Sequence, residues 1–361
     1  MGLTIRALNC PPRARGVLRS LLGIERRHEG PADIRVRFVE RISWSNDQRR
    51  AGPDAVWDGR HFGVRQPGGW LLIPFADLDE PSYELMCEQG VSGLPILRSL
   101  LQIQALRKGF VPVHGSAFLY RGLGFIATGW PRAAKTGMML AAVDGGGAVI
   151  AAENACVDPE SLLLFKATEP VRTRAWHVRQ LGSDRLVGAN ARTRLLLADR
   201  MLEAATRFGV KRGFLSHVHA AATRRNSVDM WAGPLRYASS AIRLGAIVFL
   251  ISTRGGHVSA SNNNDRQLAA QRLLLLFEEE LIPLSSHYHR YRFLVPSENR
   301  SLIDDARTRY QHLLGGLLQR VTCHEVLHSD SPAFSELRGM VDVIVDGLLP
   351  AEAHGAVSDN R

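Results

Sequence analysis

Hydrophobic and polar positions repeat with two different periods in the first third of the chain. From Ile34, the stretch IRVRFVERISW alternates apolar and polar residues, and the apolar segment GWLLIPF runs from Gly69 to Phe75. Both patterns are typical of strands. Residues 92–108 instead carry apolar side chains at helical spacing, which predicts a helix there. The beginning of the chain therefore predicts a small, β-rich lobe preceded by a basic tail.

A glycine-punctuated strand–loop–helix–strand unit is expected after this lobe. The predicted order is a strand at His114–Tyr120, a strand at Gly124–Thr128, a loop led by glycine, a helix at Thr136–Val143, and strands at Ala148–Ala152 and Ser161–Phe165. The glycines after the helix and between the first two strands are typical of turns. The pattern predicts a mixed sheet with helices.

The rest of the chain continues the same alternation. Periodicity predicts helices at 190–210, 265–281, 301–319 (broken near Gly315-Gly316) and Pro332–Leu348, and strands at Gly245–Ser252 and Val321–Leu327. We therefore expect an α/β protein with a mixed sheet. Its predicted parts are a β-rich lobe (1–105), a second domain (106–350) and a loose tail (351–361).

Composition narrows the classes of protein without naming a function. The formal net charge is +10, but the chain has only four lysines, and its many arginines are scattered. This distribution favours a solvated surface, so we do not expect a nucleic-acid partner. The four cysteines form no CxxC pair, which favours reduced thiols in a cytoplasm. The longest strongly apolar run, Gly245 to Ser252, is far shorter than a membrane span of about 20 residues, so no membrane partner is expected either.

The loop before the predicted helix carries the candidate chemistry. Its sequence, GWPRAAKT from Gly129 to Thr136, fits the Walker A pattern G-x-x-x-x-G-K-[ST] at the first glycine, the lysine and the threonine. Lys135 would neutralise the β- and γ-phosphates of a nucleotide, and the Thr136 hydroxyl would bind Mg²⁺. Ala134 replaces the second glycine, which is acceptable if its φ is negative.

Other positions of this loop also depart from the pattern. Pro131 removes one N–H donor, and the side chain of Arg132 could return positive charge to the phosphates. The N–H groups of Ala133 and Ala134 would point toward the phosphates, as backbone groups do at a helix N-terminus. The alternative is an ordinary strand-to-helix turn with a surface lysine at Lys135.

The wider segment resembles the HPr kinase/phosphorylase-like family. The residues that carry the resemblance are the strand beginning His114-Gly115-Ser116-Ala117, the glycine hairpin at Arg121-Gly122, and the Walker-like loop. It is closest over residues 106–165 and weaker through the later strands. The resemblance implies an ATP- and Mg²⁺-dependent kinase that acts on a serine hydroxyl, in a fold related to phosphoenolpyruvate carboxykinase, with His114 beside the phosphate loop.

One part of the family pattern is missing. The family has two adjacent acidic residues after the phosphate loop, whereas this chain has Ala152-Glu153 or Glu153-Asn154 at those positions, depending on the register. In a kinase, one acid orients the attacking hydroxyl and another helps to hold Mg²⁺. Glu153 can perform one of these roles, as base or metal ligand. Asp158 or an acid from elsewhere in the fold would have to perform the other.

Histidine patterns suggest a different class of protein. His324-Glu325-Val326-Leu327-His328 spells H-E-x-x-H, which binds zinc when it lies on a helix. Here the segment is predicted to be a strand, on which the two histidines would lie about 13 Å apart. The pairs His217/His219 and His287/His289 would each share one face of a strand. Together these pairs could form a metal site, although surface histidines are the simpler interpretation.

The sequence thus predicts a kinase-like protein that transfers the γ-phosphoryl group of ATP to a hydroxyl of a peptide, a protein or a small molecule. The candidate nucleotide-binding residues are Gly129, Arg132, Ala133, Ala134, Lys135 and Thr136, with Glu153 and His114 as catalytic candidates and Thr136 and Glu153 as metal ligands. A catalytically degenerate nucleotide- or partner-binding protein of the same fold is the alternative, and a metallohydrolase is the third possibility. A homo-oligomer is compatible with all three.

Overall fold

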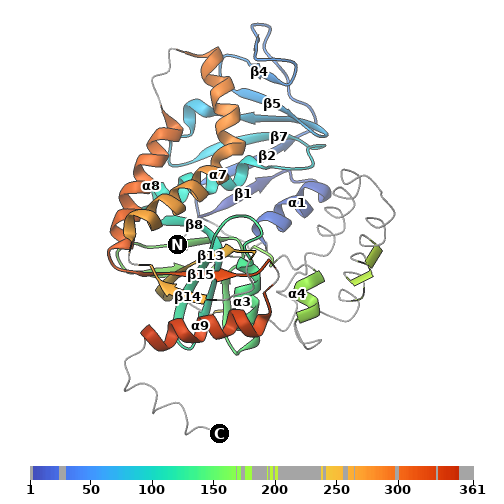
Figure 1. The fold of residues 1–361 in the computed structure, drawn as a ribbon. Helices are drawn as coiled ribbons and strands as arrows, with labels where there is room; N and C mark the ends of the chain where they lie inside the picture. The colour runs from blue at the N-terminus through green and yellow to red at the C-terminus, as the bar shows by residue number, and fades with distance from the viewer. Residues whose placement is uncertain are drawn as a thin grey trace. The chain divides into compact units, whose positions relative to one another are not determined.

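The computed structural model shows an α/β protein with two mixed sheets, which confirms the predicted class (Figure 1). It describes residues 3–23, 30–167, 169–171, 175–180, 193, 196–197, 200–201, 237–238, 241–254, 259–263, 265–296, 301–330 and 332–348. The predicted tail 351–361 and most of the predicted helix 190–210 lie outside these residues.

The chain forms two compact units that do not follow one another along the sequence. The first comprises Met1–Pro112 and Leu274–Leu314, and the second comprises Val113–Leu273 and Gly315–Arg361. The sequence-based division placed residues 274–314 with the second domain, whereas their contacts group them with the first unit. Periodicity along the chain reports local elements, so it cannot show that a later helix packs on an earlier sheet.

The first unit is built on a seven-stranded sheet. Its strands, in spatial order, are β1 (Ile5–Leu8), β2 (Ile34–Val39), β7 (Tyr83–Glu88), β6 (Gly69–Ile73), β5 (Phe62–Gln66), β4 (Ala55–Trp57) and β3 (Arg49–Arg50). The first three are parallel and the others pair antiparallel. The unit also contains helix α1 (Pro12–Leu22), the 3₁₀ helix η1 (Phe75–Asp77) and helix α2 (Ile96–Arg107).

Three predictions for this unit are confirmed with changes at the ends. In β2, Ile34, Val36 and Phe38 are buried, as the alternating pattern indicates. Strand β6 stops at Ile73 because Pro74 has no N–H to continue the ladder. The predicted helix 92–108 begins only at Ile96, directly after Pro95.

Helix α7 (Arg266–Leu294) is longer than the periodicity predicts. The prediction ended the helix at residue 281, but the helix continues through Pro283. A proline inside a helix removes one hydrogen bond and strains the turn before it. Burial of Leu284, Tyr288 and Tyr291 offsets this, since the Tyr291 ring lies 5.0 Å from that of Phe75.

Two further expectations in this region are corrected. His287 and His289 lie in α7 and not on a strand, and residues two apart on a helix do not share a face. Helix α8 (Leu302–Leu318) runs unbroken through Gly315-Gly316, because the adjacent Leu314 and Leu317 are buried and stabilise the helix.

The second unit contains the predicted mixed sheet. Strands β8 (Val111–Tyr120), β9 (Leu123–Thr128), β13 (Ile242–Ser252), β15 (Thr322–His328) and β14 (Ser259–Asn262) lie side by side in that order, with β10 (Ala148–Ala151) on the other side of β8. Strands β9, β13 and β15 are parallel to one another. Strands β11 (Asn154–Val157) and β12 (Leu163–Phe165) connect β8 with the amino end of β13.

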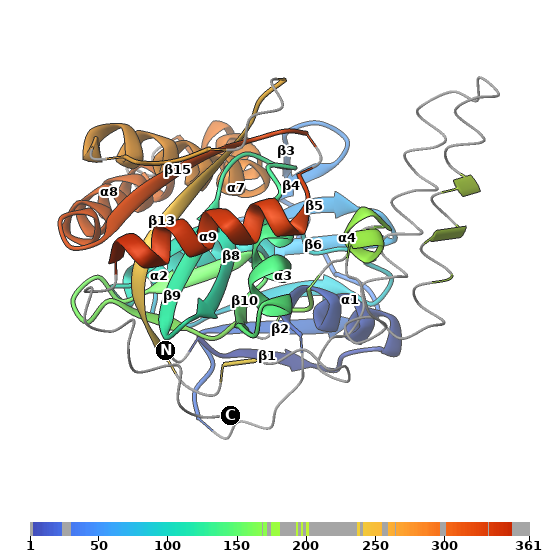
Figure 2. The same cartoon turned by 60° about the horizontal axis from the view of Figure 1, so that its bottom comes forward.

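Helices α3 (Lys135–Asp144) and α9 (Phe334–Leu348) cover one face of this sheet, and Figure 2 shows them side by side. Their buried side chains share a core with Phe125 and Ala127 of β9, Val248 and Leu250 of β13, and Val326 of β15. Helix α4 (Ala175–Gln180) contacts the start of α9, where the Gln180 side-chain oxygen accepts a hydrogen bond from the backbone N–H of Phe334 at 2.6 Å. The carboxyl ends of β9, β13 and β15 thus lie at one edge of the sheet, where the Walker-like loop begins.

Candidate functional site

The Walker-like loop leaves the sheet at a position where only glycine fits. Thr128, the last residue of β9, pairs with Phe249 of the parallel strand β13. Gly129 follows with φ 148°, and a Cβ atom there would lie 2.5 Å from the carbonyl oxygen of Leu250. The strand and the loop are therefore held close to the neighbouring backbone. A glycine at the first position of the pattern has a local structural reason in this chain.

Lys135 folds back onto its own loop. Its Nζ donates hydrogen bonds to the carbonyl oxygens of Gly129 at 2.7 Å and Trp130 at 3.1 Å. The backbone N–H of Ala133 also donates to the Trp130 carbonyl at 3.0 Å. The loop therefore surrounds the ammonium group with oxygen atoms and fixes its position. The Trp130 indole is 58% exposed beside it and offers an aromatic face to a ligand.

Two non-glycine residues of the loop have left-handed backbone conformations. Arg132 has φ 75° and Ala134 has φ 56°. The condition set for alanine at this position, a negative φ at Ala134, is therefore not met: the chain must reverse at this residue to enter α3, as it does at the second glycine of a standard loop. Each such residue stores about 1–2 kcal/mol of strain. Left-handed residues in a turn can also direct successive N–H groups toward one side, which is how backbone concavities bind anions.

Helix α3 begins without the features that usually neutralise a helix N-terminus. Its N-cap is Ala134, which provides no side-chain hydrogen bond, and the first turn contains no acidic residue. The positive end of the helix dipole and the first N–H groups thus remain available for an anion. Thr136 lies in this first turn and is half-buried.

Hydrogen bonds bring His114 and Glu153 to the start of the loop. Gly115 pairs with Thr128 across the hairpin, and the Thr128 hydroxyl donates to the carbonyl oxygen of His114 at 2.7 Å. On the other side of β8, the N–H of Gly115 donates to the carbonyl oxygen of Glu153 at 2.9 Å. Both candidate residues are half-buried. The structure therefore places His114, Glu153 and the loop next to one another.

A carboxylate that the sequence did not reveal lies beneath Glu153. Glu169 is 7% exposed and accepts hydrogen bonds from the N–H groups of Glu153 and Asn154, both at 2.5 Å, and from the Asn154 side chain at 2.9 Å. This carboxylate holds the bend that presents Glu153. Glu169 stands before Pro170 in a stretch without helical or strand periodicity, so no sequence pattern marks it.

Asp158, the other acid considered from the sequence, lies away from the loop. Its carboxylate accepts hydrogen bonds from the Ser161 hydroxyl at 2.6 Å and from the N–H of Glu160 at 2.9 Å. The Ser161 hydrogen bond lowers the pKa of Asp158 below its ordinary value. Leu162, in the same turn, accepts a hydrogen bond from the N–H of Leu244 at the amino end of β13. Asp158 is therefore at the opposite edge of the sheet from the Walker-like loop.

The H-E-x-x-H segment lies on strand β15, as predicted. Glu325 points toward α7, where Arg272 Nη1 lies 2.6 Å from its carboxylate. Since side chains alternate along a strand, His324 and His328 lie on the other face. Within the described residues, no three histidine, cysteine, aspartate or glutamate side chains are grouped to hold a metal ion. His217 and His219 lie outside the described residues.

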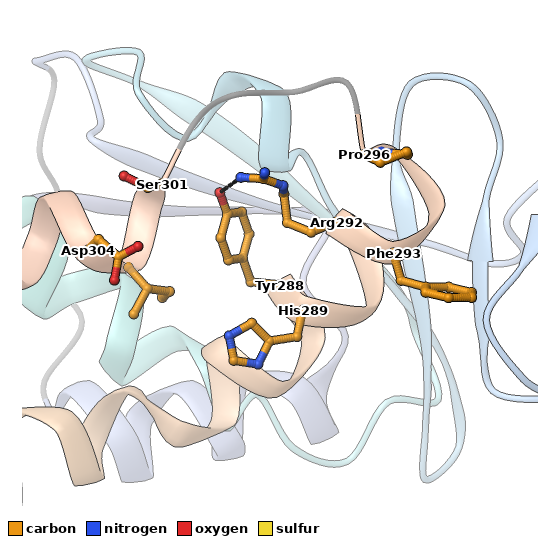
Figure 3. A pocket seen from close by; sticks show the side chains of 8 residues that line it. Tyr288, His289, Arg292, Phe293, Pro296, Ser301 and Asp304 are labelled. Carbon is orange, nitrogen blue, oxygen red and sulfur yellow. Dashed lines mark hydrogen bonds between the residues drawn. The ribbon is translucent and has the colours of Figure 1, made fainter.

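The first unit has an open hollow of about 430 Å³ at the junction of α7 and α8 (Figure 3). Its lining includes His289, Arg292 and Asp304. The Tyr288 hydroxyl accepts hydrogen bonds from Arg292 Nη1 at 3.4 Å and from the N–H of Leu302 at 3.2 Å. These contacts join the end of α7 to the start of α8 and give Tyr288 and Arg292 a structural role there.

Comparison with known proteins does not assign a family. No protein-family model matches the chain, and no curated protein matches it. Among the described helices, none combines the length and the apolar character needed to cross a membrane. The functional argument therefore depends on the geometry of the second unit.

Proposed function

We propose that the second unit binds the phosphates of a nucleoside triphosphate at the loop from Gly129 to Thr136. The observation that carries this proposal is the position of the Lys135 ammonium, which its own loop holds at the uncapped N-terminus of α3. A positive helix end and a lysine fixed beside it are what a triphosphate requires. An ordinary surface lysine at a turn would not need two backbone carbonyl groups to hold it.

We further propose a kinase-like role of the HPr-kinase type, in a related fold. In support, a glycine hairpin precedes the loop, the loop follows a strand of a mixed sheet, and Glu153 lies beside it. Lys135 and Arg132 would stabilise charge on the transferred phosphoryl group, and Glu153 would orient or deprotonate the acceptor hydroxyl. Thr136 is half-buried in the first turn of α3, and its hydroxyl would be a Mg²⁺ ligand. A bound Mg²⁺ would neutralise the β- and γ-phosphates.

A specific observation favours the alternative of a nucleotide-binding protein with little turnover. Glu169, the carboxylate nearest to Glu153 in the hydrogen-bond network, is buried and accepts three hydrogen bonds. It therefore cannot act as the second acid of a kinase without losing the bend that it supports. On this view, the chain would bind ATP and a partner protein without efficient transfer.

Binding of ATP by the wild type and by Lys135→Ala tests the central proposal. Loss of one charge-assisted interaction with phosphate is expected to weaken binding roughly 10- to 100-fold. Isothermal titration calorimetry measures this directly. Lys108→Ala is the matched control, because it removes a lysine of the first unit that pairs with Asp33 at 2.7 Å. Equal affinity in wild type and Lys135→Ala would reject phosphate binding at this loop.

Turnover by Glu153→Gln separates the two versions of the proposal. If Glu153 orients or deprotonates the acceptor, the variant should bind ATP normally and transfer the phosphoryl group, or hydrolyse ATP, roughly 100-fold more slowly. The measurement is release of ADP under saturating ATP. If turnover is the same in both proteins, Glu153 has no catalytic role and the non-catalytic alternative is preferred.

A further inference from the structure

The strand register places the end of β15 on the same side of the sheet as the phosphate loop. Leu250 of β13 pairs with Val326 of β15, and both belong to the core beneath α3 and α9. Two residues further, Ser252 pairs with His328. Because side chains alternate along strands, Ser252 and His328 face the same side as Leu250, which lies against Gly129. Adjacent strands are about 4.8 Å apart, so β15 lies only about 10 Å from β9.

An exposed carboxylate is held at this edge. The Ser252 hydroxyl donates a hydrogen bond to Oδ1 of Asp330, which follows β15 by two residues. Asp330 is exposed, and among the described residues its Oδ2 has no hydrogen-bond partner. One oxygen therefore fixes the carboxylate while the other is available to a ligand. The segment is fixed further by the N–H of Thr253, which donates to the carbonyl oxygen of His328 at 2.7 Å.

His328 provides independent evidence of unmet polar contacts at the same edge. Its side chain is fully buried, and its Nδ1 lies 2.6 Å from the carbonyl oxygen of Ser329. Because that oxygen requires a donor, Nδ1 donates the hydrogen bond, and Nε2 is the second polar atom of the ring that needs a partner. Within the described part of the chain, Nε2 has no hydrogen-bond partner. Leaving a buried polar atom unsatisfied costs about 1–3 kcal/mol, so a bound ligand or ordered water is expected there.

Three other carboxylates of this unit are committed elsewhere. Glu169 accepts three hydrogen bonds in the bend under Glu153. Asp158 lies at the opposite edge of the sheet, and Glu325 pairs with Arg272 on the opposite face. Asp330 differs from these three acids. It lies at the edge of the sheet where the phosphate loop begins, on the side that carries α3, and it has an accessible carboxylate oxygen.

We infer that Asp330 is the second acidic group of the site and completes a divalent-cation site with the Thr136 hydroxyl and the phosphates of the nucleotide. This inference rests on the proposed function. Mg²⁺ in phosphate sites keeps several waters and uses one or two carboxylates together with phosphate oxygens, so no cluster of protein ligands is needed. The role that the family pattern gives to two adjacent acids is thus divided between Glu153, at the end of β10, and Asp330, at the end of β15.

The test measures how much Mg²⁺ strengthens the binding of ATP to Asp330→Asn. In the wild type, Mg²⁺ should tighten ATP binding, and the variant should lose roughly 10- to 100-fold of that enhancement. Its affinity for ATP in the presence of EDTA should be unchanged or slightly higher, since one negative charge is removed. Asp158→Asn is the matched control: it alters an aspartate that also accepts a serine hydroxyl, but at the opposite edge.

Two outcomes overturn the inference and differ in what else they reject. If Asp330→Asn keeps the full Mg²⁺ enhancement while Lys135→Ala loses ATP binding, Asp330 is not a metal ligand but the phosphate site stands. If the wild type binds no ATP with or without Mg²⁺, both proposals fail.

Ser252→Ala provides a second variant, which keeps the carboxylate but removes the hydroxyl that fixes it. This variant should lose part of the Mg²⁺ enhancement of ATP binding. If neither Asp330→Asn nor Ser252→Ala loses any of that enhancement, the inference is contradicted.

Discussion

Individual residues of the Walker-like loop combine backbone strain with charge. Arg132 and Ala134 have left-handed conformations that glycine would adopt without cost. Arg132 is exposed, and its side chain makes no hydrogen bond or ion pair among the described residues. A strained arginine without structural contacts is destabilising to the unliganded protein. Such strain is consistent with a role in binding an anion.

Arg132→Gly should therefore change stability and binding in opposite directions. The free energy of unfolding is expected to rise by about 0.5–1 kcal/mol, because relief of the left-handed strain exceeds the entropy that glycine adds to the unfolded chain. ATP affinity should fall because the variant loses a positive charge. Urea unfolding and calorimetric titration measure the two effects. Ala134→Gly relaxes the same loop without removing charge, so it should keep ATP affinity; a parallel loss in both variants would assign the effect to loop geometry.

Which site residues could be predicted depends on whether their spacing in sequence is local. Lys135 and Thr136 lie within one loop, and Glu153 follows at the spacing that the resemblance implies, so pattern alone could select them as candidates. Glu169 and Asp330 were not among the candidates. Their positions depend on a bend and on the register of β13 with β15, which are tertiary features. The sign of φ at Ala134 also could not be predicted, because it follows from the path of the chain between β9 and α3.

At the scale of elements, the unit β9–loop–α3 depends on one close backbone contact. Gly129→Ala should destabilise the protein by roughly 2–4 kcal/mol, because the new Cβ would meet the Leu250 carbonyl oxygen in a backbone conformation that alanine also disfavours. Gly146→Ala is the matched control, since Gly146 has φ 97° but no atom within 4 Å of an added Cβ. The control should lose only about 1 kcal/mol. Urea denaturation compares the two, and similar losses would show that the contact with Leu250 is unimportant.

Element type was predictable where one face of the element is buried. The alternation at Ile34–Phe38 and the apolar run at Gly245–Ser252 both correspond to strands, and H-E-x-x-H lies on a strand as predicted. The errors occurred where tertiary packing overrides a local breaker. Pro283 does not end α7 and Gly315-Gly316 does not break α8, because buried leucines and tyrosines on either side stabilise both helices.

At the scale of the whole molecule, three elements contribute residues to both compact units. Strand β8 and helices α7 and α8 each cross a boundary between the units. Unfolding of one unit would remove the packing from part of each shared element and weaken the rest. We therefore expect the two units to unfold together, although each has its own sheet.

Cysteine labelling can test this expectation, because each unit contains a buried thiol. Burial raises the pKa of Cys87, in the first unit, to about 12 and that of Cys323, in the second, to about 11. Only the thiolate reacts, so at pH 8 both should label roughly 100-fold or more slowly than an ordinary thiol whose pKa is about 8.5. The half-buried Cys10 should react first in the native protein.

Labelling along a urea gradient, read residue by residue by mass spectrometry, should show protection of Cys87 and Cys323 lost at one midpoint. The sign follows from the pKa shifts: unfolding returns each thiol to its ordinary pKa, increases the thiolate fraction at pH 8, and accelerates the reaction. Because Cys10 is already partly exposed, its labelling should change least and serves as the internal reference. Two separated midpoints would show instead that the shared strand and helices do not couple the units, and each sheet would then have to be stable without the other.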